Sequence, residues 1–221
     1  MANKIIVVGI GPGSEAYILP EALRVIKEAK VLVGGKRALE QYAQHPFAED
    51  SKGFHGHDQI LMPIEKDIHK VLNFIREKLE YYDVVVMVSG DPGYYSMLDA
   101  LRRRFAADII QVIPGISSMQ MAFARLALPW HDAELLSFHG RIPSEARLVY
   151  EPGRLLGMLT DLKYNSASIA QLLLDKGWPA ETAMYVCSRL SYADEQIRQE
   201  QVGKIETIYE ESLFCDTCDV E

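Results

Sequence analysis

Short runs of β-branched residues alternate with amphipathic stretches along the first half of the chain. Residues 4–8 predict a strand. After a Gly-Pro-Gly turn, the apolar positions within residues 19–26 recur at helical spacing, with Pro20 in a first turn that tolerates it. Residues 31–33 predict a second strand. This order of strand, helix and strand is typical of α/β proteins with a parallel sheet.

The central part of the chain repeats this order with a stronger apolar signal. Apolar residues from Ile64 to Leu79 mark one face of a helix, and residues 84–88 follow as an unbroken apolar run. An unbroken run indicates a strand that is buried on both faces, as in a parallel sheet. Residues 97–105 predict the next helix and residues 109–113 the next strand.

Turn residues interrupt the alternation at Pro114-Gly115 and again at Pro129-Trp130, on either side of a helical apolar face at residues 119–126. The pattern of strands and helices then resumes less regularly. We therefore expect two α/β domains, an N-terminal one over residues 1–115 with the Gly/Pro loops and a C-terminal one over residues 116–221.

The second half of the chain carries fewer and weaker periodic segments. Strands are expected over residues 134–138, 155–160 and 183–187, and a helix over residues 166–176. Ser166 is the expected N-cap of that helix, because its hydroxyl can accept from a free backbone N–H. Gly177 is the expected stop at its C-terminus.

Composition and charge narrow the class of protein. Hydrophobic residues make up 48% of the chain and charged residues 24%, which is ordinary for a globular protein and excludes global disorder. The 23 Lys and Arg against 31 Asp and Glu give a net charge of -8, so no overall basic field attracts nucleic acid or an anionic membrane. The N-terminus lacks the features of a signal peptide. No apolar run approaches the ~20 residues that a membrane-spanning helix needs. The 3 cysteines are an odd number, which fits reduced thiols better than a set of disulfides. We expect a cytoplasmic protein with no nucleic-acid or membrane partner.

The first loop of chemical interest is Gly-Ile-Gly-Pro-Gly at residues 9–13, directly after the first predicted strand. A dinucleotide fingerprint has a third glycine three residues after the second, but residue 14 is serine and Pro12 removes a backbone donor. No Gly-Lys-Ser or Gly-Lys-Thr element occurs, which excludes a P-loop. The loop is therefore either a tight turn without a ligand or part of another kind of site.

Two further loops follow predicted strands. Residues 89–96 read Ser-Gly-Asp-Pro-Gly-Tyr-Tyr-Ser, and residues 114–118 read Pro-Gly-Ile-Ser-Ser. Open α/β sheets bind ligands at the carboxyl ends of their strands, where free amides and hydroxyls can meet a polar ligand group. Asp91 alone could be no more than a helix N-cap, but three Gly/Pro loops at one sheet edge indicate a binding site.

In order, spacing and strand context, the three loops resemble those of the tetrapyrrole (corrin/porphyrin) methylases, and the likeness extends over essentially the whole chain. The resemblance implies two α/β domains with the cofactor cleft between them, S-adenosylmethionine as cofactor and a tetrapyrrole as substrate. It assigns cofactor binding to Ile10, Gly11, Pro12, Gly90, Asp91, Pro92, Tyr94, Ser117 and Ser118.

Within the family, residues 137–141 (Ser-Phe-His-Gly-Arg) and residues 186–195 resemble the cobalt-precorrin-7 carbon-5 methyltransferases of cobalamin biosynthesis. This resemblance implies methylation of carbon 5 of cobalt-precorrin-7 or precorrin-6Y, a homodimer, and a separate decarboxylating carbon-15 methyltransferase as a partner. The alternatives are a family member with another acceptor, such as uroporphyrinogen, rRNA or a diphthine precursor, and a non-catalytic α/β nucleotide-binding module.

His139 and Arg141 are the candidate catalytic residues. Methyl transfer from a sulfonium needs mainly alignment and exclusion of water, so His139 would contact the substrate or act as a base that later removes a proton. A purely structural histidine is the alternative. Because the substrate carries many carboxylates, Arg141, Arg147 and Arg154 are candidate cationic contacts.

No metal site is expected from the remaining motifs. Cys215 and Cys218 form a Cys-x-x-Cys in a polar, acidic tail, where relatives of the family end on an apolar strand, and no neighbouring Cys/His pair completes a zinc site. His55 and His57 lie in a Gly- and charge-rich stretch that is typical of a solvated loop.

Overall fold

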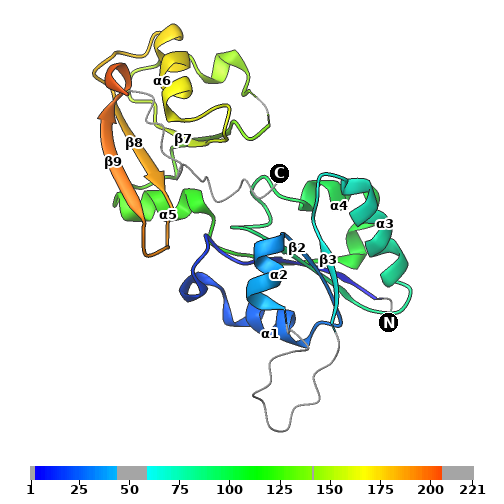
Figure 1. Ribbon diagram of the computed structural model, residues 1–221. Helices are drawn as coiled ribbons and strands as arrows, with labels where there is room; N and C mark the ends of the chain where they lie inside the picture. Colours follow the sequence, from blue (N-terminus) through cyan, green and yellow to red (C-terminus); the bar gives the residue numbers. More distant parts are fainter. Residues whose placement is uncertain (1–2, 44–58, 141, 206–221) are drawn as a thin grey trace. The chain divides into compact units, whose positions relative to one another are not determined.

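The computed structural model describes residues 3–43, 59–140 and 142–205 (Figure 1). These residues form two compact units, one ending at Ser117 and the other beginning at Ser118. The motifs at His55, His57, Cys215 and Cys218 lie outside the described residues. Within the described ranges, no helix has the length and apolar character that crossing a membrane requires.

The first unit is built on a five-stranded sheet in the order β3-β2-β4-β1-β5, in which all neighbouring strands run parallel. Its strands are β1 (Ile5–Gly9), β2 (Val31–Gly34), β3 (Ile60–Pro63), β4 (Val84–Val88) and β5 (Ile110–Ile113). Its helices are α1 (Pro20–Glu28), α2 (Lys36–Tyr42), α3 (Ile68–Lys78) and α4 (Leu98–Arg104), with single-turn helices η1 (Glu15–Tyr17) and η2 (Ala107–Ile109).

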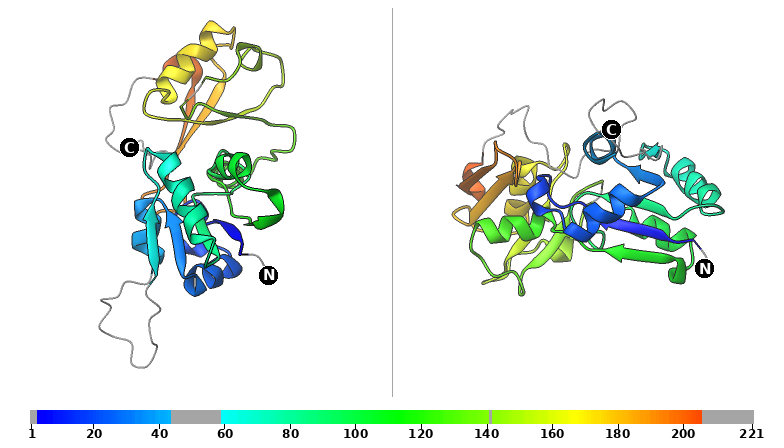
Figure 2. Two further views of the ribbon diagram at one scale, coloured as in Figure 1. Left: turned by 90° about the vertical axis from the view of Figure 1, so that its right-hand side faces the viewer. Right: turned by 90° about the horizontal axis from the view of Figure 1, so that it is seen from below.

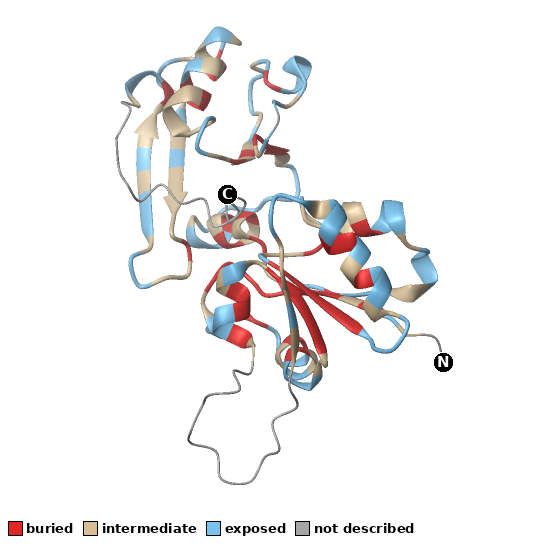
Figure 3. Cartoon of the chain, turned by 45° about the vertical axis from the view of Figure 1, so that its right-hand side comes forward, coloured by how far each residue is buried: buried red, intermediate tan, exposed pale blue. Residues whose placement is uncertain are grey.

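Helices cover both faces of this sheet. Successive residues of a strand point to opposite faces, so each strand contributes side chains to the apolar cluster on either side. On β4, Val85 and Met87 pack into one apolar cluster with Ile26 of α1 and Leu39 of α2. Val84, Val86 and Val88 pack into the other cluster, with side chains of α3 and α4. Every residue of β4 is buried, as its unbroken apolar run predicts (Figure 3). The predicted parallel α/β arrangement is confirmed.

Two elements of the first unit, α2 and β3, were not anticipated, and the helix expected from Ile64 begins later. Ile64 extends the edge of the sheet, because its N–H donates to the carbonyl of Gly34 at 2.8 Å. The helix α3 begins only after Asp67, whose carboxylate caps it by accepting from the N–H of Lys70 at 3.1 Å. The apolar spacing was correct from Ile68 onward, but it could not separate an edge strand from the helix behind it.

The second unit contains two short sheets and two longer helices (Figure 2). The helices are α5 (Ser118–Arg125) and α6 (Ser166–Asp175), with single-turn helices η3 (Glu145–Arg147) and η4 (Val202–Lys204). The strands β6 (Glu134–Ser137) and β7 (Leu156–Leu159) pair in parallel, whereas β8 (Ala183–Ser188) and β9 (Gln196–Gln201) form an antiparallel hairpin. A buried cluster holds the unit together, and it includes Leu136, Phe138, Leu148, Ile169, Leu173 and Trp178.

Two details of the second unit differ from expectation. The N-cap of α6 is Asn165 and not Ser166, since the Asn165 side chain accepts from the N–H of Ser168 at 3.0 Å. The strand β9 was missed because its sequence, Gln-Ile-Arg-Gln-Glu-Gln, carries a single apolar residue and shows no apolar alternation. Gly177 follows the helix with φ +86°, as expected of a glycine at a C-terminal stop.

Candidate functional site

The three Gly/Pro loops of the first unit meet at the carboxyl edge of its sheet. They follow β1, β4 and β5, and β1 lies between the other two strands. Gly11 and Gly90 join the first two loops through reciprocal backbone hydrogen bonds, N–H to carbonyl, of 3.3 and 2.8 Å. The expectation that these loops share one edge is therefore correct.

The side chain of Asp91 connects the second loop to the third. Its Oδ2 accepts from the N–H of Gly115 at 3.0 Å, and its Oδ1 accepts from the N–H of Gly93 at 2.8 Å. It does not cap a helix: α4 begins at Leu98, and its N-cap residue Met97 makes no side-chain cap hydrogen bond. The alternative role of Asp91 as a helix N-cap is therefore wrong, and its carboxylate instead holds two loops together.

Glycine is required where the three loops touch. A Cβ on Gly9 would lie 2.6 Å from the backbone nitrogen of Gly115, and a Cβ on Gly115 would lie 2.2 Å from the carbonyl oxygen of Gly90. Both distances are shorter than any real contact of a Cβ atom, and the opposing atoms belong to backbone that cannot rotate away. The close approach of these loops therefore depends on the missing side chains.

Two tyrosines occupy the loop after β4. Tyr95 has φ +51°, a left-handed conformation that is strained for a residue with a side chain. The rings of Tyr94 and Tyr95 pack edge to face with their centroids 4.8 Å apart. The Ser96 hydroxyl donates to the carbonyl of Pro92 at 2.6 Å and closes the turn that surrounds them. Strain that the surrounding contacts maintain is typical of binding sites, and the sequence showed no sign of it at Tyr95.

The predicted cofactor-binding residues have different surroundings. Ile10, Pro12, Pro92 and Ser117 are buried, whereas Gly90, Asp91 and Tyr94 are partly exposed. Gly11 is buried and has φ +78°. These residues belong to the joined loops, while Ser118 is the first residue of α5 in the second unit. The predicted cofactor-binding residues from Ile10 to Ser117 therefore lie on loops that contact one another. Their role in cofactor binding stays a prediction.

In the second unit, His139 lies just after β6 and is partly exposed. Its backbone N–H donates to the hydroxyl of Ser137 at 3.2 Å, and the N–H of the next residue, Gly140, donates to Asp161 Oδ2 at 3.0 Å. Asp161 follows β7, the strand that pairs with β6. Arg141, the other predicted catalytic residue, lies outside the residues whose side chains are described.

Arg147 and Arg154 both form ion pairs with Glu134. Arg147 Nε lies 2.5 Å from Glu134 Oε1, and the Arg154 guanidinium contacts Glu134 Oε2, with Nε at 3.1 Å. The hydrogen bonds from Arg147 and Arg154 outweigh the effect of burial and lower the pKa of the Glu134 carboxyl. These arginines therefore pair with an acidic residue of their own unit, and their contact with a substrate stays a prediction.

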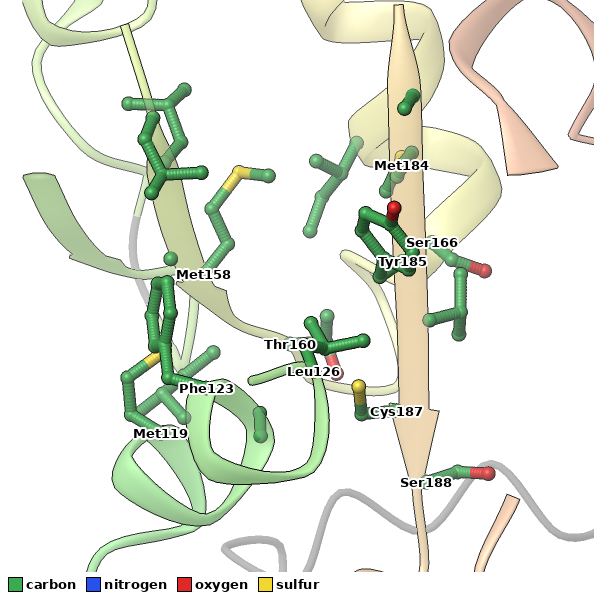
Figure 4. Close-up of a pocket in the computed structure, with 18 of the residues that line it drawn as sticks. Met119, Phe123, Leu126, Met158, Thr160, Ser166, Met184, Tyr185, Cys187 and Ser188 are labelled. Carbon is green, nitrogen blue, oxygen red and sulfur yellow. The ribbon is translucent and has the colours of Figure 1, made fainter. Parts of the chain in front are cut away.

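A cavity of about 370 Å³ lies within the second unit (Figure 4). Its wall is largely apolar and rich in sulfur: Met119 and Phe123 come from α5, Met158 from β7, and Met184 and Cys187 from β8. Burial, together with the charge of Glu195, raises the pKa of the Cys187 thiol to about 11. Burial thus disfavours the thiolate, which is the form of cysteine that acts as a nucleophile.

Comparison with known proteins adds to this geometry. The family model of the tetrapyrrole (corrin/porphyrin) methylases matches residues 4–206. A cobalt-precorrin-7 C(5)-methyltransferase of Salmonella typhimurium is 30% identical over 204 residues, which cover 92% of this chain and 94% of that enzyme. A decarboxylating precorrin-6Y C(5,15)-methyltransferase of a Sinorhizobium species is 32% identical over 191 residues, covering 86% of this chain and 43% of that protein.

A solved structure of the uroporphyrin-III C-methyl transferase of Thermus thermophilus, complexed with S-adenyl homocysteine, aligns with a TM-score of 0.67. It is 19% identical, and the alignment covers 91% of this chain and 89% of that one. A likeness at this identity concerns the fold. It agrees with the two α/β units described above.

The parallel sheet and the glycine loops at its carboxyl edge, together with the family match, define an S-adenosylmethionine-dependent methyltransferase. More particularly, the chain belongs to the tetrapyrrole methylase family, and it methylates a tetrapyrrole in cobalamin biosynthesis. The predicted family, fold class, enzyme class and cofactor are confirmed, and the alternative of a non-catalytic module is excluded.

Proposed function

We propose that this protein methylates carbon 5 of cobalt-precorrin-7. The observation that carries the proposal is the 30% identity to the Salmonella cobalt-precorrin-7 C(5)-methyltransferase over 94% of that enzyme. The match to the Sinorhizobium precorrin-6Y enzyme points to the same carbon atom. The likeness to the uroporphyrin-III C-methyl transferase structure, at 19% identity, concerns the fold and does not point to uroporphyrinogen as the acceptor.

The first unit offers a site that fits the cofactor. Its joined loops contribute glycine backbone without side chains, a partly exposed pair of tyrosine rings and a turn held by Asp91. S-adenosylmethionine supplies an electrophilic methyl group on a sulfonium, so the protein has little covalent chemistry to perform. We propose that Ile10 to Pro12, Gly90 to Pro92, Tyr94, Ser117 and Ser118 bind the cofactor and exclude water from the reacting carbon.

His139 is the proposed catalytic residue of the second unit. It would contact the acceptor or remove the proton that the methylated carbon loses, with the imidazole as base. Arg141 would bind a carboxylate of the acceptor, because a guanidinium offers two parallel N–H donors to such a group.

The match to the Sinorhizobium protein supports a second component. That protein is named for methylation at carbons 5 and 15, whereas the Salmonella relative, 94% of which aligns with this chain, is named for carbon 5 alone. We therefore propose that a separate decarboxylating methyltransferase modifies carbon 15. We also propose that the protein works in the cytoplasm as a homodimer, which light scattering of the purified protein can test.

The test of the function is a defined incubation. The purified protein is mixed with S-adenosylmethionine and cobalt-precorrin-7, and the product is examined by mass spectrometry and by NMR with a 13C-labelled methyl donor. We expect one added methyl group at carbon 5 and an equal amount of S-adenosylhomocysteine. Methylation of uroporphyrinogen III in a parallel incubation, with none of cobalt-precorrin-7, would contradict the proposal.

A further inference from the structure

The carboxylate of Asp161 collects three backbone N–H groups at the carboxyl end of β7. Oδ1 accepts from Lys163 at 2.9 Å and from Tyr164 at 2.6 Å, which closes the turn that Asp161 begins. Oδ2 accepts from Gly140 at 3.0 Å, 21 positions earlier in the chain. A local turn needs only the first two bonds, so the third makes a connection between separate loops.

The carboxylate is ionised at neutral pH. Burial opposes its ionisation, but the amides of Tyr164, Gly140 and Lys163, together with the coulombic effect of His139 when it is protonated, lower the pKa of Asp161. Hydrogen bonds to a charged acceptor are stronger than those between neutral groups. Asp161 therefore places a fixed negative charge beside His139, on the same side of the unit as the loop after β6.

The backbone around His139 is held on both sides. The His139 N–H is bound by the hydroxyl of Ser137, a residue only 2% exposed, and the Gly140 N–H is bound by Asp161. Phe138 is fully buried, and its ring packs 5.8 Å from the ring of Tyr164, which belongs to the turn of Asp161. A hydrogen bond and a ring contact thus join the same two loops independently.

We infer that Asp161 is a positioning residue for methyl transfer, which holds His139 in its working place through Gly140 and through its own negative charge. This inference rests on the proposed role of His139. Asp161 itself acts on His139 and not on the acceptor. The alternative is that Asp161 only closes its local turn, in which case replacing it would affect stability and leave the chemistry of the folded enzyme unchanged.

The variant Asp161→Asn separates these possibilities. Asparagine keeps one acceptor oxygen and nearly the same shape, but it has no negative charge and its amide nitrogen cannot accept a hydrogen bond. Asp175→Asn is the matched control. Asp175 is exposed at the end of α6, and its carboxylate accepts a hydrogen bond from the side chain of Gln171 in the same helix. His139→Gln and the double variant Asp161→Asn/His139→Gln complete a double-mutant cycle.

The measured quantities are kcat and KM for the corrinoid and the affinity for S-adenosylhomocysteine. Loss of a hydrogen bond to a charged group corresponds to about a ten- to hundredfold change, so we expect Asp161→Asn to lower kcat by about that factor. We expect S-adenosylhomocysteine to bind equally well and Asp175→Asn to behave like the parent protein. In the His139→Gln background, Asp161→Asn should have no further effect on kcat. Additive losses, or an Asp161→Asn variant that matches the control, would overturn the inference.

A measurement without substrate tests the interaction between Asp161 and His139 whether or not cobalt-precorrin-7 is the acceptor. The titration of the Asp161 carboxyl is followed by 13C NMR in the parent protein and in His139→Gln, and the chemical shift of each backbone amide confirms that both are folded. Because His139 helps to lower the pKa of Asp161, its removal should raise that pKa. If the pKa of Asp161 were the same in His139→Gln as in the parent protein, the inferred interaction between Asp161 and His139 would be overturned. If that pKa rose in His139→Gln but the parent protein did not methylate cobalt-precorrin-7, only the proposed acceptor would be refuted.

Discussion

Replacing Asp91 with alanine should separate the three Gly/Pro loops and, because we propose that these loops hold the cofactor, weaken cofactor binding as well. The change removes both acceptor oxygens that hold the amides of Gly115 and Gly93. Each hydrogen bond to a charged group is worth about 1.5–3 kcal/mol, and water replaces part of this at a partly exposed site, so we expect a loss of roughly 2–4 kcal/mol. For a chain of this size that corresponds to a melting temperature lower by about 4–16 °C.

Differential scanning calorimetry and titration calorimetry with S-adenosylhomocysteine on the same preparations provide the two measurements. Asp108→Ala is the control, because Asp108 is exposed and its side chain has no hydrogen bond described here. We expect the affinity of Asp91→Ala to fall at least tenfold and the control to change neither quantity. If Asp91→Ala kept both its melting temperature and its affinity, the carboxylate could not be what holds these loops together.

Three further predictions follow from single contacts. Gly115→Ala should lower the melting temperature and the affinity for S-adenosylhomocysteine, because its Cβ would meet the Gly90 carbonyl oxygen at 2.2 Å; equal values by calorimetry would contradict this. Trp178→Phe should lower the free energy of unfolding by about 1–3 kcal/mol in a urea titration, since the Leu148 carbonyl loses a buried 2.7 Å hydrogen bond. Arg147 and Arg154 lower the pKa of the Glu134 carboxyl. The contribution of this carboxylate to the free energy of unfolding is therefore fully present above the ordinary carboxyl pKa, and it is lost as the pH falls through the lowered pKa. Glu134→Gln should therefore flatten the dependence of melting temperature on pH in the acid range below about pH 4.5, and identical profiles would refute this.

Strong local patterns predicted most of the first unit. The apolar run of β4 could be identified because a strand covered on both faces needs apolar residues at every position. The strand β9 could not, because its residues are mostly polar and it is specified by pairing with β8 rather than by burial. The missed prediction of β9 shows that apolar periodicity detects a strand only when packing against a core, and not backbone hydrogen bonding alone, determines which residues the strand contains.

The candidate site was predictable to the level of loops and not of contacts. Gly/Pro residues after strands showed where Gly11, Gly90 and Gly115 would gather, because turn chemistry is local. No local signal showed that Asp91 would reach Gly115, or that Asp161 would reach Gly140. Such bonds depend on the order of strands in a sheet, which a single sequence does not specify.

The strand order of the first sheet also bears on how this protein acquires its function. Ile5 pairs with Val84 on one side and with Ile110 on the other, so the central strand finds both neighbours far along the chain. The N–H of Lys4 bonds to Asp83, 79 positions away. Contacts of such separation form slowly, because the intervening loops must close before the pairing stabilises them. The three Gly/Pro loops therefore come together only when nearly the whole first unit has been synthesised and folded, and if they hold the methyl donor as proposed, no shorter nascent fragment can bind it.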